Sequence, residues 1–206
     1  MKNITFLILA IFLVFSNGCS NKVRYSLMPE FEEFPPRTIA VMPIDNALEE
    51  DEDKPLLRSV INERLKQLGY KTMPLEGVDK EILSLQPEDD GANDGLDRME
   101  TARLLGVDAV MYTTITEWNK RLFLYYASLT IGVRFELYNI HGEKVWTAEY
   151  RVGESDISAD RKYLRLLMHE TYEPMVVNLV SRAFSTLPSG ILDKGIGSKE
   201  YYDWLP

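Results

Sequence analysis

Five consecutive residues, His169-Glu170-Thr171-Tyr172-Glu173, come nearest to a catalytic metal motif. The helix of a zinc protease needs two histidines four residues apart with a glutamate between them, because both imidazoles must reach one ion from the same helix face. Here Glu173 stands where the second histidine should be, and Pro174 follows at once. We therefore interpret this stretch as the solvated face of an amphipathic helix.

The acidic segment over residues 89–100 has the length and the oxygen content of a calcium-binding loop. Such a loop requires Asp or Asn at its third position and Gly at its sixth. This chain has Gly91 and Asp94 there, which is the reverse order. We interpret the segment as an ordinary acidic loop, and the acidic run over residues 49–53 as solvated residues that end in a helix cap.

Motifs for nucleotide and acyl-transfer chemistry are missing from the sequence. Pro43-Ile44-Asp45-Asn46 stands where a Gly-rich phosphate loop would follow the first predicted strand, and no Gly-Lys-Ser/Thr or Gly-x-Ser-x-Gly motif occurs. The other histidine of the chain, His141, falls in a predicted hairpin turn. The sequence therefore predicts a protein that is not an enzyme and that uses no metal or other cofactor.

Cys19, the one cysteine of the chain, follows an apolar run of about a dozen residues that begins after Lys2. This run is too short to span a bilayer and has the proportions of a secretory signal. The segment resembles a bacterial lipobox, in which Gly18 fits, whereas Ser16 and Asn17 depart from the usual Leu and Ala or Ser. The alternatives are an ordinary secretory peptide that leaves a free thiol, or an uncleaved anchor.

We therefore expect residues 1–18 to be a lipoprotein signal peptide and Cys19 to carry the acyl chains, palmitate among them. Ser20, in place of Asp, resembles the signal for sorting to the outer membrane in enteric-type bacteria. Residues 19–36, with three prolines, are predicted to form a lipidated tether that holds the domain off the bilayer.

The composition is that of one soluble domain. The chain has 206 residues, of which 45% are hydrophobic and 27% charged, and its net charge is -9. This length suits a single core. An acidic surface repels nucleic acid, so we expect no nucleic-acid partner. It also gives no attraction to anionic lipid, so membrane attachment must be covalent or hydrophobic.

Hydrophobic periodicity predicts strands that first alternate with helices and then follow one another. Alternation with period two is clearest over residues 127–137, and the turn at residues 139–142 predicts a hairpin with residues 144–152. From residue 158 the period becomes helical, and Pro174 is expected to break or restart this helix. The predicted strands are 38–44, 70–75, 108–116, 127–138 and 144–152, and the predicted helices are 53–68, 78–85, 97–105 and 158–187.

The predicted fold class is α/β (α+β): a mixed sheet with two helical crossovers, followed by an antiparallel meander and a C-terminal helix. We expect one globular domain over residues 37–187 and a C-terminal tail over residues 188–206.

An aromatic cluster crowds the connection into the long strand. Two readings are open: the cluster forms a contact surface, or it closes the end of the core. Strand alternation predicts that Phe123 packs inward and that Tyr125 points outward. The candidate interface residues are Trp118, Leu122, Phe123, Tyr125 and Tyr126.

Four stretches together resemble one known family. They are residues 38–46 (TIAVMPIDN), 105–112 (LGVDAVMY), 137–146 (LYNIHGEKVW) and, more weakly, 187–190 (LPSG). Their order and spacing are similar to those of a lipoprotein family of unknown function, typified by a genome-derived Neisseria vaccine antigen. The resemblance implies a fold like that of the TolB N-terminal domain and of the curli-secretion lipoproteins. It carries over no catalytic residue.

The resemblance also implies a function in the cell envelope. The expected role is a lipid-anchored binding or scaffold component of an envelope transport or assembly complex. The alternative is a periplasmic accessory regulator of an envelope enzyme, and a hydrolase or metalloenzyme is the third class. The expected location is the outer membrane, facing the periplasm, with surface exposure as a variant. The expected partners are the membrane, through acylated Cys19, other envelope lipoproteins including a curli-channel-like one, and a second copy of the chain.

Overall fold

The computed structural model describes residues 22–46, 54–85 and 98–190. Cys19, the acidic run 49–53, most of the loop 89–100 and residues 191–206 lie outside these ranges. In chain order the elements are β1 (Arg24–Leu27), α2 (Glu30–Glu33), β2 (Thr38–Val41), β3 (Asp45–Asn46), α3 (Lys54–Gln67), β4 (Lys71–Thr72), α4 (Leu75–Leu85), α5 (Arg98–Leu104), β5 (Ala109–Leu122), β6 (Tyr126–Asn139), β7 (Lys144–Ile157) and α6 (Arg161–Phe184).

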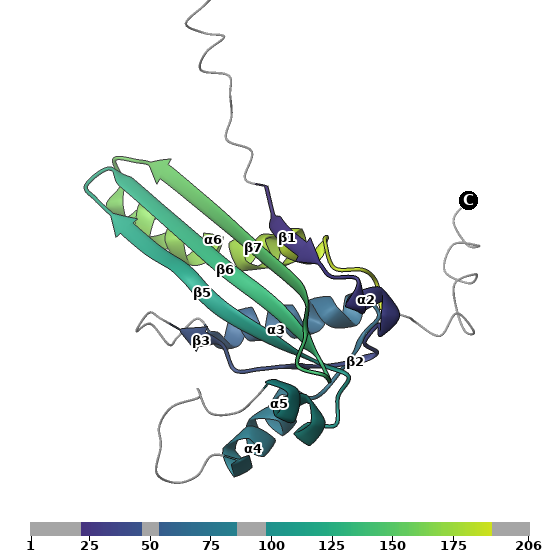
Figure 1. Ribbon diagram of the computed structural model, residues 1–206. Coiled ribbons are helices and arrows are strands. Elements are labelled where there is room, and N and C mark those ends of the chain that lie inside the picture. The colour runs from purple at the N-terminus through teal and green to yellow at the C-terminus, as the bar shows by residue number, and fades with distance from the viewer. Residues whose placement is uncertain (1–21, 47–53, 86–97, 191–206) are drawn as a thin grey trace, which may run out of the picture.

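The strands form one mixed sheet in the order β1-β7-β6-β5-β2-β4, with β3 also paired to β5 (Figure 1). Strand β2 runs parallel to β4 and β5, whereas β5, β6, β7 and β1 pair antiparallel. Helical crossovers thus build the parallel part, and hairpins build the rest. The fold class predicted from the sequence is confirmed.

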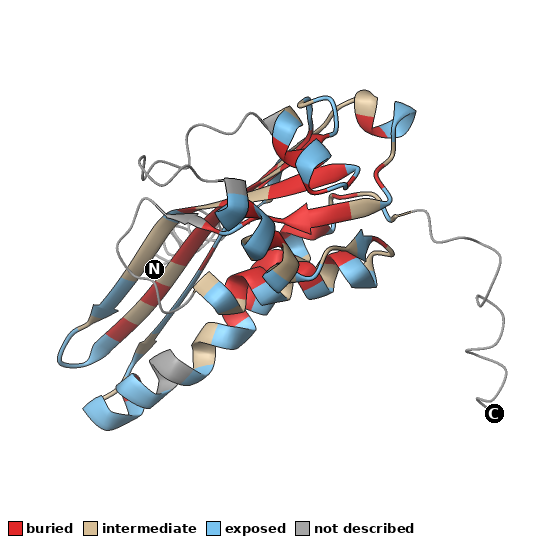
Figure 2. Ribbon diagram, turned by 90° about the horizontal axis from the view of Figure 1, so that it is seen from below, coloured by how far each residue is buried: buried red, intermediate tan, exposed pale blue. Residues whose placement is uncertain are grey.

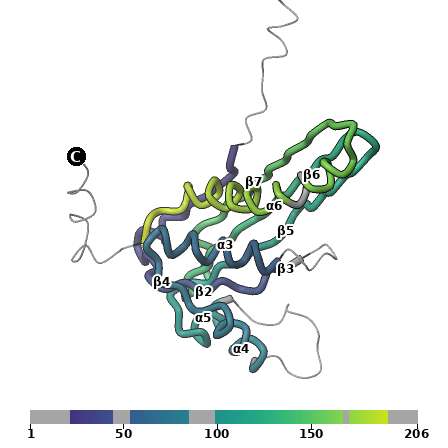
Figure 3. The backbone as a smooth tube through the Cα atoms, turned by 180° about the vertical axis from the view of Figure 1, so that it is seen from behind, coloured from purple at the N-terminus to yellow at the C-terminus, as the bar shows by residue number. Residues whose placement is uncertain are grey.

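The main core lies between the sheet and the two helices α3 and α6, which cover the same face (Figure 3). Along β6 every second residue from Ala127 to Leu137 is buried against them. Phe184 of α6 meets the rings of Phe135 and Trp146 edge to face at 5.1 and 5.4 Å. Each of these aromatic side chains contributes roughly 2–3 kcal/mol through burial.

A second, smaller core lies on the opposite face, at the end of the sheet nearest β2 and β4. There Val78 and Ile82 of α4 and Ala102 of α5 pack against Ala40 and Val110. The sheet therefore has helices on both faces at this end. The far halves of β5, β6 and β7 are covered on one face only, and Figure 2 shows exposed residues gathering there.

The prediction of a tether over residues 19–36 is wrong for much of that segment. Strand β1 pairs with β7 in the register Arg24 to Glu149 and Leu27 to Trp146. Phe31 of α2 is 4% exposed and belongs to the main core. The pairing of β1 satisfies backbone groups at the edge of β7, and α2 buries an apolar side chain that a solvated linker would leave exposed. The domain therefore begins before residue 37.

Pro174 does not break the last helix as predicted, because α6 continues from Arg161 to Phe184. A proline inside a helix costs about 3 kcal/mol. Burial of the apolar residues that follow it, among them Met175, Leu179 and Phe184, exceeds that cost. At the start of the helix, the side chain of Asp160 accepts hydrogen bonds from the N–H groups of Lys162 and Tyr163.

The chain that follows α6 stays attached to the fold as far as residue 190. Leu187 is buried, and the chain just beyond it is fixed by two hydrogen bonds. The hydroxyl of Tyr70 donates to the carbonyl of Pro188, and the N–H of Gly190 donates to the carbonyl of Leu68 at 2.8 Å. Burial raises the pKa of the Tyr70 phenol, which stays neutral and keeps its proton for this bond.

Within the described ranges, no helix has both the length and the apolar content needed to span a membrane.

Asp108 joins the start of β2 to the residue before β5. Its Oδ2 accepts hydrogen bonds from the N–H of Arg37 at 3.0 Å and from the N–H and the hydroxyl of Thr38, both at 2.8 Å. Desolvation raises the pKa of this carboxyl, but the hydrogen bonds from Thr38 and Arg37 and the charge of Arg37 outweigh it and lower the pKa below its usual range.

We expect Asp108→Asn to lower the free energy of unfolding at neutral pH by roughly 1 kcal/mol, as loss of a charge-assisted hydrogen bond does. Because the pKa is lower in the folded state, this stabilisation is complete above the pKa of the unfolded chain and is lost as the pH falls through the folded pKa. Denaturant titrations between pH 7 and pH 2 should show the difference between wild type and variant shrinking. Glu63→Gln, at an exposed pair on α3, is the control. A difference that stays constant over this range would contradict the assignment.

Candidate interaction surface

The far end of the sheet closes in a short hairpin whose side chains point into solvent. The N–H of Phe123 donates to the carbonyl of Tyr126 at 2.7 Å, which leaves residues 123–125 to make the turn between β5 and β6. Phe123, Leu124 and Tyr125 are 62%, 70% and 60% exposed. Turns at hairpin ends usually carry polar residues, so three large apolar side chains here indicate a contact surface.

The end of β7 extends this surface. Ile157 pairs with Tyr126 and is 76% exposed. The next residue, Ser158, donates its N–H to the carbonyl of Tyr125 at 3.0 Å and so holds the turn against the chain that enters α6. We call Phe123, Leu124, Tyr125, Tyr126 and Ile157 the apolar tip.

The first two turns of α6 lie beside the apolar tip and expose two further large side chains, Tyr163 and Leu166. The hydroxyl of Tyr163 donates to Asp156 of β7, at 3.4 Å, which ties the helix to the strand end. Ile157, Tyr163 and Leu166 were not among the residues predicted from the sequence. Ile157 lies at the end of a strand, and Tyr163 and Leu166 lie in the polar first turns of a helix. Nothing in the surrounding sequence indicates that these side chains are exposed at a contact surface.

The predicted interface residues divide between the two readings. Trp118 and Leu122 lie on the inner face, where they pair with Ile131 and Ala127 and are half-buried. The ring of Trp118 packs edge to face on Tyr172 of α6 at 5.4 Å. Trp118 therefore packs against the main core, and Leu122 lies on the same face of the sheet nearer the turn.

The other three predicted residues, Phe123, Tyr125 and Tyr126, are exposed at the apolar tip. The prediction that Phe123 packs inward is wrong. Residues two apart in a strand share a face, so alternation cannot separate Phe123 from Tyr125, and both lie in the turn beyond Leu122, where β5 ends. The prediction that Tyr125 points outward agrees with the structure.

A β-bulge between Ile115 and Glu117 sets which side chains of β5 face the core beyond it. Gly132 opposite the bulge makes room, since a Cβ there would lie 2.9 Å from the hydroxyl oxygen of Thr116. The bulge shifts the alternation by one residue and turns Trp118 inward. Sequence periodicity before the bulge could not show this.

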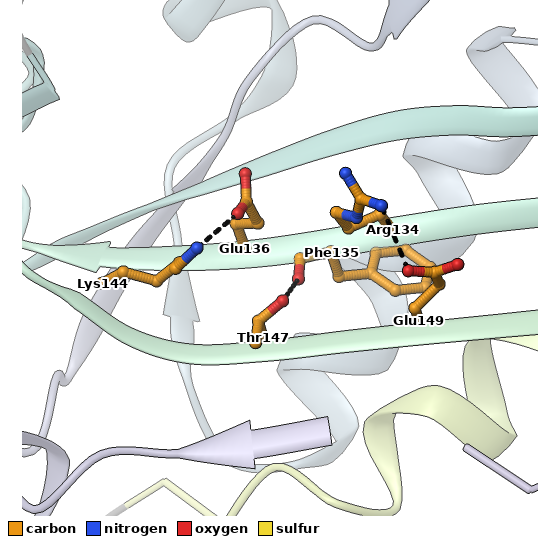
Figure 4. Close-up of polar contacts among 6 residues, drawn as sticks. All are labelled: Arg134, Phe135, Glu136, Lys144, Thr147 and Glu149. Atoms are coloured by element: carbon orange, nitrogen blue, oxygen red, sulfur yellow. Dashed lines mark hydrogen bonds and ion pairs between the residues drawn. The ribbon is translucent and has the colours of Figure 1, made fainter. Parts of the chain in front are cut away.

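The outer face of β6 and β7 is polar and its charges are paired. Lys144 contacts Glu136 at 2.9 Å and Arg134 contacts Glu149 at 3.2 Å, while the ring of Phe135 points to the other side of the sheet (Figure 4). Exposed pairs of this kind contribute about 0.2–1 kcal/mol. The face is therefore hydrated and balanced in charge, and it can contact a partner without burying an unpaired charge.

The cavity between the far end of the sheet and α6 is small, about 160 Å³, and is lined by residues such as Leu129, Asp156 and Thr171. Sites for drug-sized ligands occupy about 300–1,000 Å³. This cavity is thus smaller than such sites.

In residues 22–46, 54–85 and 98–190, no three His, Cys, Asp or Glu side chains come together as metal ligands. The ring of His141 lies against Phe34 at 5.8 Å. The side chain of His169 and most of the loop 89–100 lie outside the described part.

The buried Arg58 makes structural contacts. Its guanidinium donates to the carbonyl of Val41 through Nε and Nη2, at 3.2 and 2.8 Å, and its Nη1 contacts Asp79 at 2.6 Å. It ties α3 and α4 to the end of β2, so its charge is already used by the fold.

Comparisons with known proteins give a likeness of fold. No family model matches the chain, and no curated protein matches it in sequence. A PelC dodecamer from Paraburkholderia phytofirmans is similar with a TM-score of 0.50 and 19% identity, over 82% of this chain and 99% of that one. The lipoprotein GNA1162 from Neisseria meningitidis is similar with a TM-score of 0.53 and 18% identity, over 68% of this chain and 97% of that one. The predicted resemblance to a Neisseria lipoprotein is confirmed in the fold, and the solved structures that share this fold include lipoproteins.

Proposed function

We propose that the protein is an outer-membrane lipoprotein acylated on Cys19, and that its domain is a non-catalytic binding or scaffold component of an envelope transport or assembly complex. The observation that carries this proposal is the apolar tip. Five large apolar side chains exposed together at one end of a domain favour a protein that works in contact with other envelope components.

Lipid anchoring is supported by the position of the lone cysteine. Cys19 ends an apolar run of signal-peptide length and stands five residues before β1. One acyl chain binds a membrane reversibly, whereas the two or three of a bacterial lipoprotein hold it stably. The proposed location is the periplasmic side of the outer membrane, because Ser20, in place of Asp, resembles the signal for sorting to that membrane.

The proposed protein partners are other envelope lipoproteins, a curli-channel-like one among them, and further copies of this chain. Self-association is supported by the PelC structure, which is a dodecamer of the same fold. The outer face of β6 and β7, whose charges are paired, is a candidate surface for such partners. If affinity purification from solubilised envelopes recovers an enzyme with the domain instead of other lipoproteins, the result would favour the alternative function, a periplasmic accessory regulator of an envelope enzyme.

Replacing the acyl acceptor tests the anchor. We expect Cys19→Ala to release the domain into the periplasm or to leave the signal peptide uncleaved, because no thiol remains to accept the diacylglycerol. Fractionation of cells and intact mass measurement of the purified chain check this. Ser20→Ala, next to it, should remain acylated. Absence of lipid mass and of incorporated palmitate in the wild-type chain would overturn the proposed anchoring.

Replacing a residue of the apolar tip tests its role. Because Tyr125 is exposed, we expect Tyr125→Ser to leave the melting temperature nearly unchanged. It should reduce the yield of cross-linked complexes in intact envelopes, since a weaker contact of the apolar tip leaves the domain less well positioned to meet its partners. The matched control is Phe135→Ser in the core, which should cost about 3–5 kcal/mol of folding free energy. Thermal denaturation and cross-linking before solubilisation measure the two effects. A large loss of stability in Tyr125→Ser would show that the turn closes the core instead.

A further inference from the structure

We propose that the apolar tip inserts into the surface of the lipid bilayer that holds Cys19, so that the domain meets the membrane at two points. This inference rests on the acylation proposed above and names the partner of the tip. It follows from the chemistry of the exposed side chains, the charges around them and the length of chain between Cys19 and the sheet.

The chemistry of the apolar tip suits the boundary between headgroups and acyl chains. Phe123, Leu124 and Ile157 are apolar, and Tyr125 and Tyr126 combine an apolar ring with a hydroxyl that can remain among the headgroups. Unpaired backbone groups are costly in such a setting. In the turn, the N–H of Phe123 and the carbonyl of Tyr125 are already bonded within the chain, which lowers the cost of leaving water.

Cations surround the apolar tip in a chain that is otherwise acidic. The exposed bases near it are Lys120, Arg121, Arg161, Lys162 and Arg165, and the acids of the same two segments are Glu154, Asp156 and Asp160. Five bases against three acids give residues 119–127 and 154–166 a net charge of +2, whereas the whole chain carries -9. A basic residue near an anionic surface contributes about 1 kcal/mol. The net positive charge of this end is therefore opposite in sign to anionic headgroups and attracts them.

The short connection to Cys19 brings the bilayer to this end of the domain. Strand β1 is antiparallel to β7, so its first residue, Arg24, faces the end of the sheet that carries Ile157. Arg24 follows Cys19 by five residues, which reach at most about 17 Å. From Glu149, the partner of Arg24, to Ile157 is eight residues, or about 27 Å. An upright domain thus extends about 10 Å past the furthest reach of Cys19, which matches the 5–10 Å depth of interfacial apolar groups.

A protein partner fits this end less well. A standard protein interface involves about 20–30 residues on each side. The apolar tip offers five, with Tyr163 and Leu166 beside them, on a turn that projects from the end of three strands (Figure 1). A projecting apolar end with cations on the two segments beside it is suited to entering a lipid surface.

The test places an environment-sensitive fluorophore on the tip of the mature, acylated protein. Acylation blocks the thiol of Cys19, so Phe123→Cys supplies one reactive thiol for labelling after purification. The matched control is Ile140→Cys, an exposed apolar residue in the β6–β7 turn at the opposite end of the same strands. Both proteins are reconstituted into vesicles of phosphatidylethanolamine and phosphatidylglycerol, with intact mass and melting temperature recorded for each.

We expect the emission of the probe at position 123 to shift to the blue and to be quenched several-fold more strongly by brominated lipid than the probe at position 140. Equal, water-like emission at the two positions in acylated protein would overturn the inference and leave the proposed anchoring intact. A blue shift that needs a second protein, and that brominated lipid does not quench, would assign the tip to that protein and also overturn it. A chain without lipid mass would defeat the anchoring, and the inference with it.

Discussion

The packing of α6 against β5, β6 and β7 is the contact on which the rest of the structure depends. Three strands of 14 residues present one continuous apolar face, and α6 buries it from Leu164 to Phe184. The aromatic contacts of Phe184 at one end and of Tyr172 with Trp118 at the other hold the helix along the strands. This packing lets the three strands project beyond the body of the domain as a stiff extension.

The two ends of the sheet therefore serve different needs. Near β2 and β4 the sheet is covered on both faces, and Arg58 and Asp108 make polar links within the fold there. The far end has one covered face, paired charges on the other and large apolar side chains at its turn. The first end is packed on both faces, and the second leaves one face and its turn available for contact. A stiff extension that ends in an apolar tip is well suited to span the distance between a membrane and a partner held beside it.

The pairing of β1 with β7 changes what the N-terminal segment can do. A solvated linker from Cys19 to residue 36 would reach about 60 Å and would leave the orientation of the domain open. With Arg24–Leu27 held in the sheet, only five residues connect Cys19 to the first residue of β1, and they reach at most about 17 Å. Four residues of edge strand thus turn a loose tether into a short one. In the proposed arrangement, the acyl anchor at Cys19 and the apolar tip face the same surface.

Local sequence patterns determined much of this protein. The alternation over residues 127–137 gave the long strand and its buried face, helical spacing gave α3 and the end of α6, and the place of Cys19 gave the predicted anchor. Tertiary structure decided the rest. The bulge that turns Trp118 inward, the edge pairing of β1, the continuity of α6 through Pro174 and the meeting of Phe123 with Ile157 all depend on neighbours distant in sequence. Periodicity reports which side of an element is buried, but it ends where the chain turns, and only the packed sheet shows which residues come together there.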